Sequence, residues 1–128
     1  MNVAALVRSG GGPVKARPAR LIATRSVQDA FKRVLAAGLV HLLANERGLL
    51  RGADPEYLHQ ARVALRRLRS ALDVFSPPLP RSAIVPVARE LKWLASRLGP
   101  ARDWDVFVSE TLPPLEAEIG AHVGLEAF

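Results

Sequence analysis

Cysteine is absent from this 128-residue sequence, which excludes disulfides and thiolate metal ligands. Long hydrophobic runs are absent too, because the longest one, Val34 to Ala44, is interrupted by His41 and is too short to span a bilayer. The N-terminus also lacks the charged start and apolar run of an export signal. These absences fit a reducing compartment, and we expect a cytoplasmic protein without a membrane partner.

Alternating apolar and polar positions, the mark of a β-strand, form no stretch long enough to predict one. Hydrophobic residues make up 49% of the chain, so its length is enough for one domain with a core. We therefore expect an all-α fold, an antiparallel bundle of about four main helices with short connections. The expected helices cover about residues 27–50, 55–76, 82–98 and 101–112, followed by an amphipathic piece over 115–127.

Capping residues set the expected boundaries of the first two helices. Ser26, with Asp29 three residues later, is typical of an N-cap, and Gly52 suits a C-terminal stop. Asp54 followed by Pro55 predicts the start of the second helix. The dipeptides expected to end the second, third and fourth helices are Pro77-Pro78, Gly99-Pro100 and Pro113-Pro114.

The chain divides into three expected segments. Residues 1–24 contain a glycine run and scattered prolines and cations, and we interpret them as a flexible leader or interdomain linker. Residues 25–112 form the helical bundle. We expect residues 113–128 to form an additional C-terminal helix or the start of a second half of the domain.

Charge is distributed unevenly between the two halves. Residues 1–70 hold thirteen Lys/Arg and four Asp/Glu, a net charge of +9, whereas residues 71–128 hold five and eight, a net charge of −3. Fifteen of the eighteen cations are arginine, whose guanidinium suits bidentate contacts to phosphate. The basic half indicates a polyanionic partner.

The most specific pattern is a stripe formed by His59, Arg62, Arg66 and Arg69, spaced by 3, 4 and 3 residues. On a helix these side chains share a sector of roughly 80°, beside an apolar sector that can be buried. No acid lies from Leu58 to Ala71, so the cations have no partners within their own helix. Because stacked guanidinium groups repel each other, the stripe is tolerated best when an anion binds across it.

Several other residues are candidates for the same surface or its support. His59 can contact phosphate, serve structure or bind a metal, and the neighbouring arginines make the metal the weakest alternative. The lone His41 among apolar residues, with Asn45 one turn on, is interpreted as a core residue. Trp93 and Trp104 are expected to pack between helices. The additional candidate cations are Arg67, Lys32, Arg33, Arg47 and Lys92.

Arg102-Asp103-x-Asp105 invites a metal-binding or catalytic interpretation. Its expected position at a helix start favours another role, in which Asp103 stabilises the helix dipole and either acid orients an arginine of the stripe. We therefore expect these three residues to support the site, and we expect neither a metal site nor a cofactor.

The segment His59-x-x-Arg62-Val63-x-x-Arg66-Arg67-x-Arg69 resembles the first histidine motif of the CHAD family, helical domains known for binding inorganic polyphosphate. A second segment, Glu90 to Leu94 with Leu98 to Val106, is similar to the family's third-to-fourth helix region. The resemblance covers about residues 26–112. It implies that the stripe and Lys92 contact polyphosphate.

In CHAD domains, two similar helical bundles face each other. This chain resembles the first bundle alone. We therefore expect either a homodimer or an additional half-domain to cover leucines such as Leu39, Leu43 and Leu50. The leader resembles the stretch that joins a CYTH triphosphatase domain to a CHAD domain in bacterial proteins. The ExExK strand of CYTH enzymes has no counterpart here.

The sequence therefore predicts a non-enzymatic polyphosphate-binding module, half of a CHAD domain, in the cytoplasm or at polyphosphate granules. Two alternatives remain open. One is a nucleic-acid-binding helical module, which shares the basic helix but would have few aromatic residues for stacking on bases. The other is a scaffold module of a triphosphatase-type protein whose basic face meets a protein partner.

Overall fold

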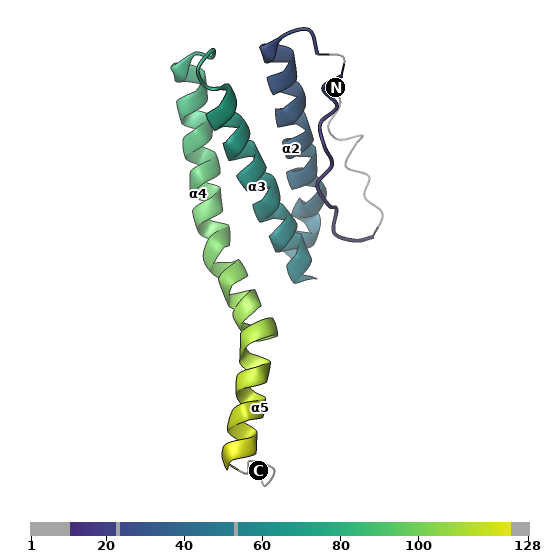
Figure 1. Ribbon diagram of the computed structural model, residues 1–128, viewed down its shortest axis with the longest axis vertical. Helices are drawn as coiled ribbons and strands as arrows, with labels where there is room; N and C mark the ends of the chain where they lie inside the picture. Colours follow the sequence, from purple (N-terminus) through teal and green to yellow (C-terminus); the bar gives the residue numbers. More distant parts are fainter. Residues whose placement is uncertain (1–10, 23, 53, 124–128) are drawn as a thin grey trace.

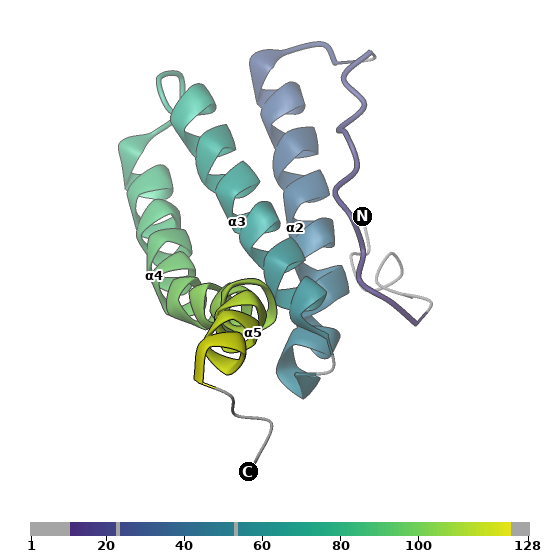
Figure 2. The ribbon, with the colours of Figure 1, turned by 60° about the horizontal axis from the view of Figure 1, so that its bottom comes forward.

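The computed structural model describes residues 11–22, 24–52 and 54–123, and this part is all-α, which confirms the expected fold class. Helix α3 lies between α2 and α4, and the three run antiparallel in one layer (Figure 1, Figure 2). α4 continues through a π-helical turn, η1, into α5, which extends beyond the ends of α2 and α3 (Figure 1). The elements are α2 (Val27–Arg51), α3 (Pro55–Phe75), α4 (Arg81–Val106), η1 (Phe107–Thr111) and α5 (Leu112–Val123).

The predicted caps of α2 and α3 are confirmed. The Ser26 hydroxyl accepts a hydrogen bond from the Asp29 N–H at 3.1 Å, which satisfies a donor of the first turn. Gly52 ends α2 at φ 61°, a conformation that favours glycine, and its N–H donates to the Leu49 carbonyl. The Asp54 carboxylate caps α3 by accepting from the Glu56 N–H at 2.8 Å.

The core lies between α2 and α3, and most of its residues come from α3. Leu65 and Leu68 are only 1% and 2% exposed. Gly38 of α2 permits the close approach, because a Cβ there would lie 2.6 Å from Leu68 Cδ2. Alanine would therefore force the two helices apart or the leucine out of its rotamer. The apolar side of α3 is held against α2, and this fixes the direction of its basic side.

A buried polar group joins the N-terminal segment to this core. His41 is 3% exposed, and its Nε2 lies 2.9 Å from Gln60 Oε1, which confirms the predicted core histidine. The fully buried Asn45 amide donates to the carbonyls of His41 and Val14, and its oxygen accepts from the Val14 N–H. Residues 11–22, the N-terminal strap, are thereby attached to α2 in extended form.

The expected break at Gly99-Pro100 is wrong, because α4 passes through both residues. Proline clashes with the Cβ of the residue before it when that residue is helical, and Gly99 has no Cβ. The missing N–H of one proline bends a long helix without ending it. The expected helix start near residue 82 is confirmed to within one residue, since α4 begins at Arg81, and the helix includes Pro86.

The expected end at Pro113-Pro114 is likewise wrong. The π turn η1 ends at Thr111, and the two prolines follow after Leu112 as the second and third residues of α5. A π turn interrupts the regular α-helical hydrogen-bond pattern, so the missing proline N–H groups fall next to a stretch where that pattern is already altered. The predicted third, fourth and last helices are therefore one continuous helical run.

α4 exposes residues that were expected to pack. Within α4 no residue is buried, and Val87, Trp93 and Trp104 are 47%, 54% and 66% exposed. The expectation that the two tryptophans lie between helices is therefore wrong, because α3 covers α4 from one side only (Figure 2). Leu39 and Leu50 of α2 are exposed, as their position on that helix predicted. None of the described helices has the length and apolar character of a membrane span.

Candidate anion-binding groove

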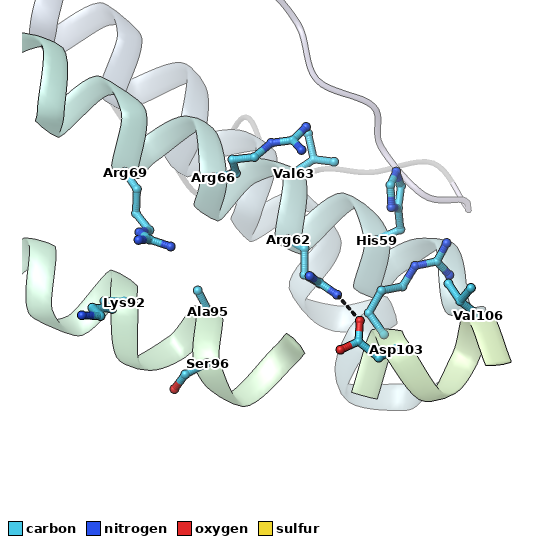
Figure 3. Close-up of a pocket in the computed structure, with 11 residues that line it drawn as sticks. His59, Arg62, Val63, Arg66, Arg69, Lys92, Ala95, Ser96, Asp103 and Val106 are labelled. Carbon is cyan, nitrogen blue, oxygen red and sulfur yellow. Dashed lines mark ion pairs between the residues drawn. The ribbon is translucent and has the colours of Figure 1, made fainter. Parts of the chain in front are cut away.

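An open groove of about 690 Å³ lies between α3 and α4 (Figure 3). Five cationic side chains and one carboxylate line it, so its charge is strongly positive. Its polar lining residues are His59, Arg62, Arg66, Arg69, Lys92, Ser96, Arg102 and Asp103, and the apolar ones are Val63, Ala95 and Val106.

The α3 wall of the groove is the predicted stripe. Burial of Leu65 and Leu68 prevents α3 from turning about its axis, so the stripe cannot leave the groove. Arg62 and Arg69 point toward α4, whereas Arg66 points away from α4 (Figure 3). The stripe thus presents cations both inside the groove and on the ridge of α3 that borders it.

Arg62 ties the two walls together. Its Nη1 lies 3.5 Å from Asp103 Oδ1 and donates to the Gly99 carbonyl at 3.3 Å. Asp103 therefore orients an arginine of the stripe. We had expected Asp103 at a helix start, but it lies in the last turn of α4. These two contacts hold the part of α4 around Gly99 and Asp103 beside α3.

The remaining cations of the groove have no polar partners within the described structure. Among the described residues, Arg66, Arg69, Lys92 and Arg102 have neither an ion pair nor a hydrogen bond from the side chain. Cations from two helices that face one hollow with a single carboxylate repel each other, and an anion between them removes that repulsion. Phosphate oxygens suit both guanidinium and ammonium groups.

Arg102 was predicted as a supporting residue, and the structure places it in the lining itself. Ser96 was missed, although it lies one helical turn after Lys92 and so shares its face. Asp105 is absent from the lining, and within the described ranges its carboxylate has no ion pair.

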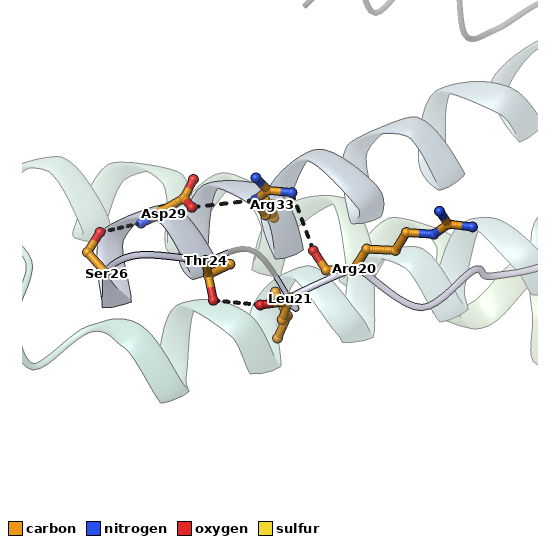
Figure 4. A network of polar contacts seen from close by, with 6 residues as sticks. All are labelled: Arg20, Leu21, Thr24, Ser26, Asp29 and Arg33. Atoms are coloured by element: carbon orange, nitrogen blue, oxygen red, sulfur yellow. Dashed lines mark hydrogen bonds and ion pairs between the residues drawn. The ribbon is translucent and has the colours of Figure 1, made fainter.

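The other predicted cations lie outside the groove. Arg33 of α2 pairs with Asp29 at 3.5 Å and donates to the Arg20 carbonyl of the strap (Figure 4). Lys32 and Arg47 are exposed on α2 and do not line the groove. Arg67 donates to the Arg17 carbonyl of the strap at 3.2 Å. None of these four residues lies in the groove with the stripe.

In the described part of the chain, no three His, Asp or Glu side chains gather as metal ligands would. The chemistry of the groove is that of charge and hydrogen-bond donors. The arrangement can bind an extended anion along α3, with contacts from α4.

Comparison with known proteins gives one family and one solved structure. Residues 33–128 match the profile of the CHAD domain. The fold is similar to the crystal structure of the CHAD domain from the plant Ricinus communis, with 40% sequence identity and a TM-score of 0.71 over 90% of this chain. The chain spans 40% of the length of that plant chain. No curated protein matches it significantly.

Proposed function

The chain belongs to the CHAD domain family, and we propose that it binds inorganic polyphosphate in the groove between α3 and α4 without acting on it as an enzyme. One observation carries the proposal: the groove gathers five cations from two helices around a single carboxylate. The ligand is the one that the sequence resemblance implied. A cytoplasmic location, including polyphosphate granules, is part of the same proposal.

Binding would proceed by charge neutralisation. Successive phosphates would accept hydrogen bonds from Arg62, Arg66 and Arg69 along α3, while Lys92 and Arg102 would reach the chain from α4. Each cation that neutralises a phosphate releases a condensed counter-ion, so the affinity should fall as salt rises. With four to six phosphates in contact, the slope of log affinity against log salt should be about −3 to −4, at about −0.7 per phosphate.

The decisive test is a titration with tripolyphosphate. The double variant Arg69→Gln with Lys92→Gln removes one free cation from each wall, and we expect it to weaken binding by about tenfold to a hundredfold. Its matched control is Arg25→Gln with Arg51→Gln, which removes the same charge from exposed positions outside the groove. Equal affinities of the two double variants would show that only net charge matters.

Competition separates the nucleic-acid alternative. We expect polyphosphate to displace a single-stranded oligonucleotide from the chain at equal phosphate concentration, because the groove offers cations but no aromatic platform among its lining residues. An oligonucleotide that displaced polyphosphate would favour the nucleic-acid function. If neither anion bound, the basic face would be better explained as a surface for a protein partner.

A further inference from the structure

A second groove lies on the other side of Arg66. It has a volume of about 360 Å³, runs between α2 and α3, and shares Arg66 with the first groove. Its floor is apolar, and its polar lining residues are Arg66, Arg67 and Ser70. The full lining is Val34, Gly38, Arg66, Arg67, Ser70, Ala71, Val74 and Phe75, which includes no carboxylate.

The three polar residues form one rim along the exposed side of α3. Arg66 and Ser70 are separated by one helical turn and share a face, and Arg67 lies next to them on the side of α2. Arg66 and Arg67 have no ion pair within the described structure. A hydroxyl beside two guanidinium groups is a set of donors that suits phosphate oxygens.

Arg67 is poorly satisfied where it is. Its Nη2 donates to one neutral acceptor, the Arg17 carbonyl, and its Nη1 is buried without a partner among the described residues. A phosphate group carries a full negative charge and offers several oxygens to the guanidinium fork, whereas a backbone carbonyl is a single neutral acceptor. An anion on the rim would therefore draw Arg67 away from the strap and supply the acceptor that Nη1 lacks.

We propose that Arg66, Arg67 and Ser70 form a second phosphate subsite, onto which a polyphosphate chain continues from the first groove by crossing α3 at Arg66. This inference rests on the proposed function and adds to it a preference for chains long enough to reach both grooves. It also makes the contact between Arg67 and the strap an alternative to ligand binding.

Chain length provides the test. Tripolyphosphate should bind wild type and Arg67→Gln with affinities that agree within about twofold, whereas long-chain polyphosphate should bind the variant about tenfold more weakly. Ser70→Ala should lower only the long-chain affinity, by a smaller factor, while leaving the charge and the strap contact unchanged. Arg51→Gln is the control for charge, because Arg51 is exposed and lines neither groove.

The Nε–H resonance of Arg67 in nuclear magnetic resonance spectra gives a direct second measurement. It should shift on addition of long-chain polyphosphate and stay unchanged with tripolyphosphate. An unmoved resonance, or an equal loss of long-chain affinity in Arg67→Gln and Arg51→Gln, would overturn the second subsite. Failure of tripolyphosphate to bind at all would contradict the first groove, so the two proposals fail separately.

Discussion

The pair α2–α3 and the run α4–α5 are built in opposite ways. Every residue that the structure buries lies in α2 or α3, including the polar side chains of His41, Asn45 and Gln60. The described part of α4–α5 has no buried residue and exposes large apolar side chains such as Trp104. The groove lies between these two kinds of helix.

Because of this difference, the two walls of the groove are held with different firmness. α3 is a fixed wall, because its apolar side is packed on α2 and its cations cannot turn away. α4 is a lightly held wall, attached to α3 by modest contacts that include those of Arg62. Substitutions in α2 and α3 should therefore change stability, whereas those in α4 should change the groove with little effect on folding.

The largest expected contrast is between Leu65 and Val85. Leu65→Ala leaves a cavity in the core and should lower the free energy of unfolding by about 2–5 kcal/mol. Val85→Ala, on exposed α4, should change it by less than about 0.5 kcal/mol. Urea unfolding followed by circular dichroism measures both. Similar losses in the two variants would show that α4 is packed as firmly as α3.

A second contrast concerns buried and exposed polar side chains. Asn45→Ala leaves the Val14 backbone without its partners and should cost about 1–3 kcal/mol. Ser96→Ala on α4 removes only an exposed hydroxyl bonded to the Trp93 carbonyl, and should change stability by less than about 0.5 kcal/mol. Thermal unfolding of the two variants tests this, and an Asn45→Ala protein as stable as wild type would mean that the strap contributes nothing.

The smallest expected contrast is between two substitutions to alanine that change the free energy of unfolding in opposite directions. Gly38→Ala places a methyl group against the buried Leu68 and should destabilise the fold by about 1–2 kcal/mol, despite the better helix propensity of alanine. Ser82→Ala, at an exposed position of α4, raises the helix propensity without meeting a buried neighbour and should stabilise that helix by up to about 0.5 kcal/mol. Denaturant midpoints of the two variants should therefore shift in opposite directions. Shifts in the same direction would contradict the division between the two regions.

Local signals were predictable from the sequence, and signals that depend on distant neighbours were not. The caps at Ser26, Gly52 and Asp54 could be predicted because each involves residues within a few positions. The stripe on α3 could be predicted because helical spacing alone creates it. Gly99-Pro100 was misjudged because a proline ends one helix and bends another, and the choice depends on what surrounds it.

Contacts across long sequence separations were also beyond prediction. Arg67 contacts a carbonyl fifty residues earlier, and no local pattern indicates that its side chain reaches the strap. The exposure of Trp93 could not be foreseen, because aromatic residues at helical spacing normally indicate a buried face. Composition predicts that such residues prefer burial, but it does not say whether a neighbour is present to bury them.

The contact between Arg62 and Asp103 means that the protein carries a counter-ion of its own. The carboxylate is tethered 3.5 Å from the guanidinium, so it competes with any anion at a high effective concentration. Because its side chain is 79% exposed, this ion pair is worth little more than about 1 kcal/mol and yields to a strong competitor. A polymer that binds the neighbouring cations at the same time would displace it easily, whereas a single weak anion would not. If the groove binds an anion as proposed, Asp103 would set the charge density that this ligand must exceed to reach Arg62.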